Sequence, residues 1–185
     1  MELYLQKGAP ERMEERLEKE QRCYELLESL GIAFDRVDHE PAENMEVCQS
    51  IETVLGAPIC KNLFLCNRQQ TQFHLLLMPG DKPFRTKELS AQIGSARLSF
   101  AGADKMLEYL DILPGAVSVM GLMNDRENNV QLLIDEDVLK GEYVGCHPCV
   151  NTSSLRLKTA DVIEIFLPAV HHTYQTVRLI GGEPL

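Results

Sequence analysis

The two runs Asn62-Leu63-Phe64-Leu65-Cys66 and Phe73-His74-Leu75-Leu76-Leu77-Met78 decide the fold class of this chain. Both have the length and apolar content of β-strands, and the connection between them, residues 67–72, is polar. This pattern predicts an antiparallel hairpin. The second run is apolar almost without a break, which is typical of a strand buried on both faces. The hairpin is therefore expected to lie at the centre of a β-sheet.

On both sides of the hairpin, apolar residues recur at helical or strand spacing. Helices are predicted over residues 10–30, 44–55, 86–93 and 103–110, and from Thr159 or Asp161 to Pro168. Gly31, Gly56 and Gly94 follow the first three helices, and Thr86 is expected to cap the third. Further strands are predicted over residues 32–37, 97–100, 130–135, 154–157 and 177–180. Because no internal repeat or linker interrupts this pattern, residues 1–185 are expected to form one mixed α/β domain.

The composition is that of an ordinary globular protein, with 44% hydrophobic and 25% charged residues over 185 positions. This length suffices for one domain with a core of its own. No apolar run approaches the roughly 20 residues that cross a bilayer, and the N-terminal segment lacks the pattern of a signal peptide. We therefore expect a cytoplasmic protein without membrane contacts, in which the six cysteines stay reduced.

The formal net charge of −10 argues against a protein that coats nucleic acid, and DNA is not expected as a partner. A small contact with phosphates is compatible with this charge. Residues 80–97 contain only two acidic side chains, Asp81 and Glu88. The basic side chains of the same segment are Lys82, Arg85, Lys87 and Arg97. This basic cluster is either an ordinary solvated surface or a place where a few phosphates bind.

Nucleotide-driven and serine-hydrolase chemistries have no motif in this chain. The sequence contains no Gly-x-x-x-x-Gly-Lys-Ser/Thr phosphate loop, no Gly-x-Gly-x-x-Gly fingerprint, no Gly-x-Ser-x-Gly elbow and no His-Glu-x-x-His pair. Side chains that carry chemistry gather instead in residues 145–152, Gly-Cys-His-Pro-Cys-Val-Asn-Thr.

Three interpretations of residues 145–152 compete: half of a metal site, a reactive thiol, or a histidine in a pocket. Two further ligands for a structural zinc would have to come from Cys60 and Cys66 or from His171-His172. The five residues between Cys60 and Cys66 fit the spacing of zinc knuckles poorly. A reactive thiol would lack the following helix that lowers a thiol pKa. Buried, unreactive thiols are the default expectation, and no metal is expected.

Three segments of the chain together resemble a known family. They are Cys60-Lys61-Asn62-Leu63-Phe64-Leu65, Leu113-Pro114-Gly115-Ala116-Val117-Ser118 and Cys146-His147-Pro148-Cys149-Val150-Asn151-Thr152. Their order and spacing resemble the YbaK-type aminoacyl-tRNA editing domains, and within that family the free-standing prolyl-tRNA synthetase-associated proteins of the ProX or PrdX branch. The likeness covers residues 20–180 approximately. It implies a single editing domain with a mixed, mostly antiparallel β-sheet flanked by helices, preceded by a helix over residues 10–30.

The resemblance also implies an activity and a set of site residues. The activity is hydrolysis of the ester that joins a wrong amino acid to the 3′-terminal adenosine of a tRNA, without metal or cofactor. The catalytic residues implied are Lys61, Gly115 and His147, and the substrate-binding residues are Asn62, Ala116, Val117, Ser118, Val119 and Asn151. The family's Gly-x-x-x-Pro loop corresponds to residues 115–119, where Val119 replaces the proline.

Each implied residue has an expected role. Main-chain N–H groups near Gly115 would hold the oxyanion that forms during ester hydrolysis. Lys61 would stabilise negative charge or orient the terminal nucleotide, and His147 would hydrogen-bond the adenosine. The substrate's own 2′-hydroxyl would activate the attacking water, because the sequence places no obvious protein base.

Physical limits on recognition explain why such an enzyme is needed. A synthetase pocket shaped for proline cannot strongly reject the smaller alanine, because a missing methylene changes binding by only about 1–3 kcal/mol. The resemblance therefore implies a deacylase that edits mischarged tRNA(Pro) in trans, most of all Ala-tRNA(Pro), with the tRNA acceptor 3′ end and prolyl-tRNA synthetase as partners. The alternative is a non-catalytic module of the same fold that binds a tRNA or a synthetase. Lys61 favours the enzyme, and Val119 favours the module.

Overall fold

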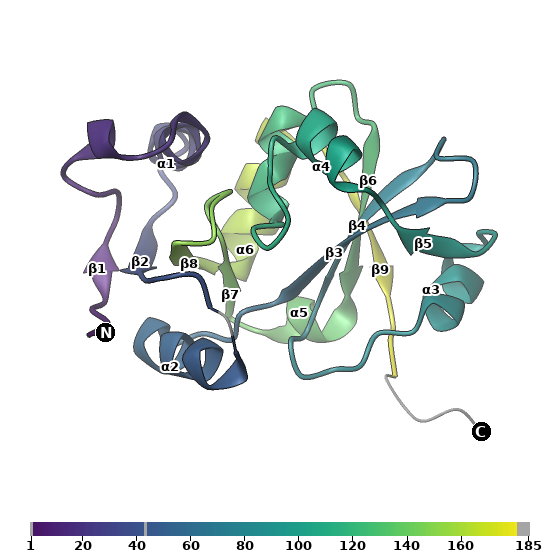
Figure 1. Cartoon of the computed structure of the whole chain (residues 1–185), viewed down its shortest axis with the longest axis horizontal. Helices are drawn as coiled ribbons and strands as arrows, with labels where there is room; N and C mark the ends of the chain where they lie inside the picture. The colour runs from purple at the N-terminus through teal and green to yellow at the C-terminus, as the bar shows by residue number, and fades with distance from the viewer. Residues whose placement is uncertain (1, 43, 181–185) are drawn as a thin grey trace.

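Two β-sheets with helices around them make up the fold in the computed structural model, which describes residues 2–42 and 44–180 (Figure 1). The first sheet is antiparallel throughout, in the order β1-β2-β8-β7. Its strands are β1 (Gln6–Lys7), β2 (Phe34–Asp38), β7 (Tyr143–Cys146) and β8 (Ser153–Lys158). The second sheet has the order β5-β3-β4-β6-β9. Its strands are β3 (Lys61–Asn67), β4 (Phe73–Met78), β5 (Leu98–Phe100), β6 (Val130–Asp135) and β9 (Tyr174–Val177).

The predicted hairpin is confirmed as the centre of the second sheet. β3 and β4 pair antiparallel from Lys61 opposite Met78 to Cys66 opposite Phe73. Every residue of β4 is buried, as its unbroken apolar run predicted. β5 pairs antiparallel with β3, whereas β6 and β9 run parallel to β4 and to each other. The mixed α/β fold class with mostly antiparallel pairing is confirmed, and its strands divide between two sheets.

The helices lie outside the two sheets and between them (Figure 1). They are α1 (Glu18–Ser29), α2 (Met45–Leu55), α3 (Thr86–Ile93), α4 (Ala103–Leu110), α5 (Glu136–Lys140), and a last helix formed by α6 (Thr159–Asp161), the π-helical turn η3 (Val162–Phe166) and α7 (Leu167–Ala169). Two 3₁₀ turns complete the set, η1 (Met13–Glu15) and η2 (Val119–Asn124). The predictions for α2 and α4 are confirmed. The side chain of Asn44 caps α2 by accepting the N–H of Val47. No helix of the described ranges is long and apolar enough to cross a membrane.

Three sequence predictions need correction. The first helix begins at Glu18, because the chain is extended at Arg16 and Leu17 and lets the Arg16 guanidinium reach Asp38. Thr86 does not cap α3; Arg85 holds the cap position without a side-chain bond. The last strand covers Tyr174–Val177, where it pairs with β6, and residues 178–180 lie beyond it.

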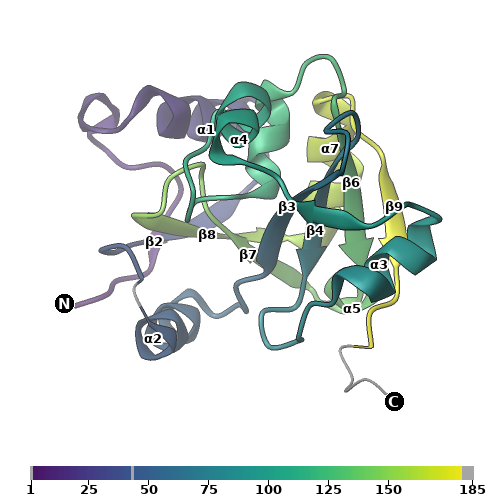
Figure 2. The ribbon, with the colours of Figure 1, turned by 45° about the vertical axis from the view of Figure 1, so that its right-hand side comes forward.

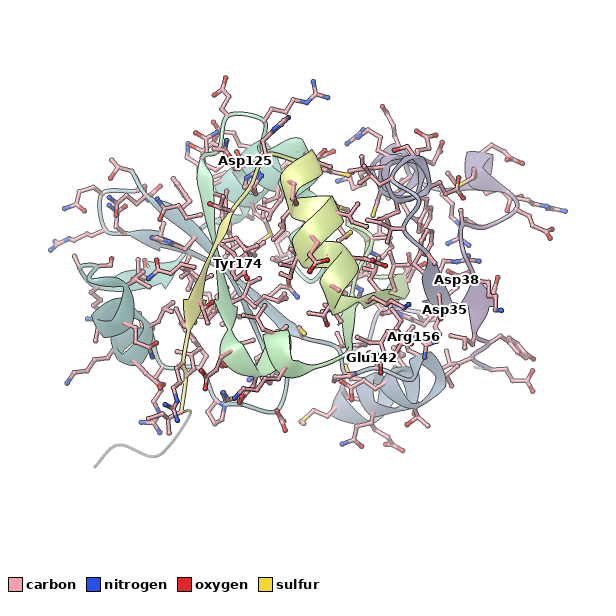
Figure 3. The ribbon with its side chains drawn as sticks, turned by 180° about the vertical axis from the view of Figure 1, so that it is seen from behind. Asp35, Asp38, Asp125, Glu142, Arg156 and Tyr174 are labelled. Atoms are coloured by element: carbon pink, nitrogen blue, oxygen red, sulfur yellow. The ribbon has the colours of Figure 1, made fainter. Side chains whose placement is uncertain are left out.

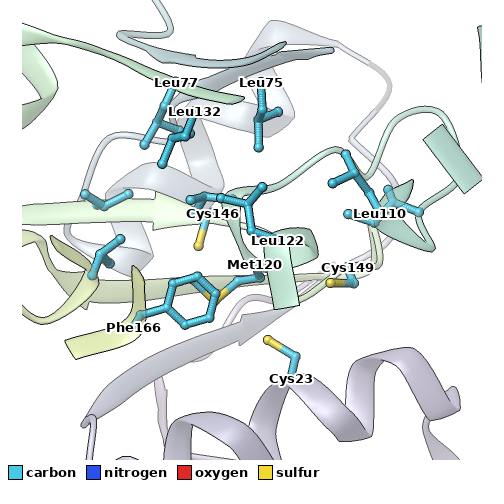
Figure 4. Close-up of a cluster of buried hydrophobic side chains, with 14 of the residues drawn as sticks. Cys23, Leu75, Leu77, Leu110, Met120, Leu122, Leu132, Cys146, Cys149 and Phe166 are labelled. Atoms are coloured by element: carbon cyan, nitrogen blue, oxygen red, sulfur yellow. The ribbon is translucent and has the colours of Figure 1, made fainter. Parts of the chain in front are cut away.

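Two apolar clusters fill the space between these elements. The larger lies between the two sheets and includes side chains from α1, α4, η2 and the last helix (Figure 4). The smaller lies on the opposite face of the second sheet, where α3 packs over Leu65, Leu76 and Leu133 (Figure 2). Side chains alternate along β3, so Lys61 lies on the same face as Leu65, and Asn62 faces the larger cluster.

Candidate functional site

The two sheets meet where residues 58–60 run beside Gly145. Ile59 and Gly145 form a parallel bridge, and the Cys60 N–H donates to the Gly145 carbonyl over 3.2 Å. A side chain at position 145 would place its Cβ 2.6 Å from the Pro58 carbonyl oxygen, so only glycine permits this approach. Lys61 and His147 each follow the bridged pair by two residues. The bridge therefore brings two of the segments implied by the resemblance to one place.

Lys61 begins β3 at the wall of a cavity of about 940 Å³. Its Nζ donates to the main-chain carbonyl of Lys82 over 2.7 Å. The cavity walls come from α2, from residues 58–61, from the loop of residues 79–83 and from the segment around α5 (Figures 1 and 2). The side chains from α2 and the α5 region are Met45, Cys48, Gln49, Glu52, Asp137, Val138 and Tyr143. This volume lies in the range of small-molecule sites.

Lys82 turns its side chain away from solvent and towards two aspartates. Its Nζ lies 2.8 Å from Asp135 Oδ2 and 2.9 Å from Asp137 Oδ2. Burial by itself lowers the pKa of Lys82, but the bonds to both carboxylates outweigh it and leave the pKa above its ordinary value. Lys82 is therefore a charged residue with its charge balanced inside the fold.

The cavity is supported from behind by Arg156 on β8. Its guanidinium lies over the ring of Tyr143, 4.7 Å from the centroid, and bonds to Asp35 on β2. Figure 3 shows Asp35 and Arg156 side by side on the two strands. Tyr143 is thereby fixed as a wall residue by a cation–π contact.

Asn62 connects β3 to the loop of residues 115–119. Its Oδ1 accepts the N–H of Val119 over 3.1 Å, and its Nδ2 donates to the Cys60 carbonyl over 3.1 Å. Ser118 caps the following 3₁₀ turn by accepting the N–H of Met120. Asn62 is thus held at both ends of its amide, and a proline at position 119 would offer it no N–H.

Gly115 and Asn151 approach each other at the outer side of this loop. Gly115 has φ +91° and is exposed, and a Cβ built on it would lie 3.7 Å from Asn151 Nδ2. The N–H of Ala116 is occupied by the Leu113 carbonyl at 3.1 Å. Across residues 2–42 and 44–180, the N–H groups of Gly115 and Val117 have no hydrogen-bond partner. These two amides are the ones that could receive an oxyanion.

His147 is held in one tautomer by the main chain. Its Nδ1 lies 2.8 Å from the Ser153 carbonyl oxygen, which only accepts hydrogen bonds, so Nδ1 carries the proton. Burial lowers the pKa of His147, the bond to Ser153 partly offsets this, and the nearby ring of His39 lowers the pKa further. The imidazole is therefore neutral at pH 7, with Nε2 as a hydrogen-bond acceptor.

A charged network fixes the strand ends behind His147. The Oγ of Ser153 donates to Asp38 Oδ1 over 2.7 Å, and Arg16 and Arg36 bond to the same carboxylate. Asp38, labelled in Figure 3, lies at the end of β2 opposite Ser153 at the start of β8. This network fixes the strand that presents the Ser153 carbonyl to His147.

The thiols of residues 145–152 are part of the apolar core. Cys146 and Cys149 are each 1% exposed, and Figure 4 shows both among core side chains with Cys23. Burial raises the pKa of Cys146, and burial and nearby Glu52 raise that of Cys60 to about 12. All six cysteines are free thiols. Protonated, buried thiols are poor nucleophiles, which favours the packing interpretation.

The cysteines and histidines considered above as zinc ligands do not form a metal site in the part of the chain that the structure describes. No group of three or more His, Cys, Asp or Glu side chains in the described ranges could hold a metal ion. His172, one of the imagined ligands, bonds instead to Asp125 with 3.0 Å between Nε2 and Oδ2.

The structure thus brings the three segments together but gives them different surroundings. Lys61 lines the 940 Å³ cavity, whereas residues 115–119, His147 and Asn151 are not among its lining residues. Sequence reasoning did not find the α2 wall, the loop of residues 79–83 or Tyr143. Pro79 and Gly80 are ordinary turn residues after a strand, and nothing local in the sequence shows that this turn folds back beside Lys61.

The chain thus has a mixed α/β fold of two sheets, with a cavity that Lys61 and Lys82 help to line. A model of the aminoacyl-tRNA editing domain matches residues 39–165, so the chain belongs to the aminoacyl-tRNA editing domain family. The family expected from the three segments is confirmed.

Known proteins similar to the chain have names that refer to prolyl-tRNA editing or to prolyl-tRNA synthetase. The prolyl-tRNA editing protein ProX of Acetoanaerobium sticklandii is 29% identical over 163 residues, which cover 88% of this chain and 99% of that protein. Prolyl-tRNA synthetase associated domain-containing protein 1 of Mus musculus is 31% identical over 162 residues, 85% of this chain and 92% of that one. A crystal structure of a candidate trans-editing enzyme for prolyl-tRNA synthetase shares the fold, with a TM-score of 0.67 at 16% identity over 89% of this chain and 98% of that chain.

Proposed function

We propose that this protein is an aminoacyl-tRNA deacylase that hydrolyses mischarged tRNA(Pro) in trans, with Ala-tRNA(Pro) as its favoured substrate. The observation that carries the proposal is the position of Lys61, whose ammonium lies at the wall of a cavity large enough for an aminoacylated nucleotide. The similarity to ProX supports the choice of tRNA(Pro). On this proposal the partners are the acceptor 3′ end of the tRNA and prolyl-tRNA synthetase.

The chemistry requires little beyond positioning. An aminoacyl ester is already reactive, so the site must hold the ester, supply a water and stabilise the oxyanion. Lys61 contributes a positive charge beside the bound nucleotide, and the amides of Gly115 and Val117 offer free N–H groups. The acceptor nitrogen Nε2 of His147 can receive a hydrogen bond from the 2′-hydroxyl or from a water.

The geometry limits how a substrate can use these groups together. Lys61 lies in the cavity, and Gly115 and Asn151 lie beside the loop that Asn62 holds. A substrate that contacts both must therefore extend across the start of β3. One short ligand can contact both Lys61 and the Gly115 loop if its terminal nucleotide lies in the cavity and its aminoacyl group points towards Gly115.

The test is deacylation of tRNA(Pro) charged separately with alanine, serine, cysteine or proline. We expect rapid release of alanine, little release of proline, and loss of alanine release in Lys61→Ala. Lys105→Ala is the matched control, because Lys105 pairs with Glu108 on α4 and is not among the residues that line the cavity. Wild-type activity in Lys61→Ala would remove Lys61 from the mechanism.

The same samples distinguish the alternative function. A non-catalytic module would bind charged tRNA(Pro) or the synthetase but release none of the amino acids. Val119 is the observation that favours this outcome, since it departs from the family's loop pattern.

A further inference from the structure

We propose that Lys82 is a positioning residue for Lys61: its side chain anchors the loop of residues 79–83 to α5, and its carbonyl then fixes the Lys61 ammonium. The contacts are present whatever the protein's activity. Only their effect on turnover rests on the proposed deacylase function.

The anchor is an ion triad of Lys82, Asp135 and Asp137, in which the Lys82–Asp135 pair is largely closed to solvent and Asp137 is half-exposed. The Lys82 side chain is 15% exposed and Asp135 is fully buried, with 2.8 Å between Nζ and Oδ2. Asp135 is itself fixed, because its Oδ1 caps α5 by accepting the N–H of Asp137 over 3.0 Å. Asp137 supplies the second carboxylate to Lys82 at 2.9 Å. Opening this pair would leave the buried Asp135 carboxylate without its countercharge, which is costly, whereas an exposed pair opens at little cost.

The backbone of the loop has a second fixed point at Gly80. A Cβ at that position would lie 2.7 Å from the Ile59 carbonyl oxygen, so the loop packs directly on the segment before Lys61. The turn between the two points is closed by the Lys82 N–H, which donates to the Pro79 carbonyl over 3.3 Å. With both ends fixed, the Lys82 carbonyl has one position relative to β3. It accepts from Lys61 Nζ over 2.7 Å.

This arrangement sets the direction of the Lys61 side chain. A lysine has a flexible stem and three N–H donors on one ammonium. One donor is taken by the Lys82 carbonyl, which leaves two for a ligand in the cavity. Without that carbonyl the ammonium would sample several rotamers, and a small misplacement of a catalytic group lowers the rate steeply.

The basic-cluster hypothesis makes a different prediction for Lys82. As a phosphate contact, Lys82 would affect tRNA affinity and its salt dependence. As a positioning residue, it affects turnover and the reactivity of the Lys61 amine. A phosphate contact would therefore change KM, whereas a positioning role would change kcat, and steady-state kinetics distinguishes the two interpretations.

The variant to test is Lys82→Met/Asp135→Asn, since it removes both charges and avoids a buried unpaired aspartate. Asparagine also keeps the cap of α5. Lys140→Met is the matched control, because Lys140 pairs with the same Asp137 and is not among the residues that line the cavity with Lys61. Acetylation of Lys61 by limiting acetic anhydride, followed by mass spectrometry, reports on the amine directly; circular dichroism confirms folding.

We expect Lys61 to be acetylated several-fold faster in the double variant and at the wild-type rate in the control. Deacylation kcat should fall about tenfold with KM nearly unchanged. An unchanged acetylation rate in the folded double variant would overturn the proposal, as would faster acetylation with unchanged kcat. If the wild-type protein releases no amino acid, the deacylase function fails, and acetylation alone decides whether Lys82 positions Lys61.

Discussion

Val119 makes a hydrogen bond that the proline of the family's loop pattern could not make. The position is the first residue of η2, and Ser118 before it is extended, a conformation that a following proline accepts. The backbone would therefore tolerate the proline of the family pattern. What proline cannot supply is the N–H that Val119 donates to Asn62.

This bond predicts that one substitution has a smaller effect in one background than in the other. Val119→Pro in the wild type should lower the free energy of unfolding by about 1–3 kcal/mol, because Asn62 Oδ1 loses its donor and the fully buried Val119 side chain is replaced. Asn62→Ala should lower it by about 1–3 kcal/mol, since the Val119 N–H is left without a partner. Adding Val119→Pro to Asn62→Ala should then lower stability by less than it does in the wild type, because it removes that orphan donor. Urea unfolding of the wild type, the two single variants and the double variant gives the coupling free energy between positions 62 and 119. Additive effects of the two substitutions would contradict the prediction.

Asp38 predicts a pH dependence of stability. Burial raises its pKa, but hydrogen bonds from Arg16, Ser153 and Arg36 outweigh burial and bring the pKa to about 2 from 3.8. The unfolded chain therefore binds a proton on Asp38 at a higher pH than the folded chain does. This stabilisation, about 2 kcal/mol, is fully present above pH 4 and is lost as the pH falls through 2.

The measurement compares urea unfolding of the wild type and Asp38→Asn between pH 5 and pH 2. The difference in unfolding free energy should shrink by about 2 kcal/mol across that range. Parallel curves would show that the native carboxylate is not held as the contacts imply.

At the scale of elements, local sequence signals were sufficient to predict an element when its own residues, or those beside it, set its ends. Asn44 and Gly56 fix both ends of α2, with a side-chain cap at one and φ +74° at the other. The hairpin β3–β4 follows from two apolar runs and a polar connection. In each case the residues that decide the structure lie within or beside the element.

Elements whose ends depend on distant partners could not be predicted in this way. α1 starts late because Arg16 bonds to Asp38, 22 residues further along the chain. β9 is defined by its pairing with β6 rather than by its own apolar content. The division of the strands into two sheets likewise depends on which strands pair, and single-strand patterns do not specify partners.

At the scale of the molecule, the family resemblance indicated residues for the candidate site, and nothing in the sequence indicated how those residues are arranged. The resemblance indicated Lys61 and Asn62, residues 115–119, and His147 and Asn151. The Ile59–Gly145 bridge and the Asn62–Val119 bond bring the segments that carry these residues together. The cavity walls from α2 and the loop of residues 79–83 arise only in the folded chain. Lys82 is the clearest case, because its charge indicated a surface position and its ammonium instead bonds to the fully buried Asp135.

On the proposed function, the net charge of −10 makes the remaining basic residues decisive for binding tRNA. An acidic protein repels a polyanion as a whole, so attraction must come from a local group of cations close to the site. With Lys82 committed to Asp135 and Asp137, the cluster retains Arg85, Lys87 and Arg97. Arg85 lies two residues after Pro83, which lines the cavity, and Lys87 is exposed on the first turn of α3.

We therefore expect Arg85→Gln/Lys87→Gln to weaken tRNA binding and to flatten its dependence on salt. Each lost phosphate contact should reduce the slope of log K against log salt by about 0.7–0.9. Lys82→Met/Asp135→Asn should leave that slope unchanged, since Lys82 is neutralised within the fold. Filter binding of tRNA(Pro) at several salt concentrations measures both. A slope that falls with Lys82 but not with Arg85 and Lys87 would mean that the loop of residues 79–83 contacts phosphate, and that α3 does not.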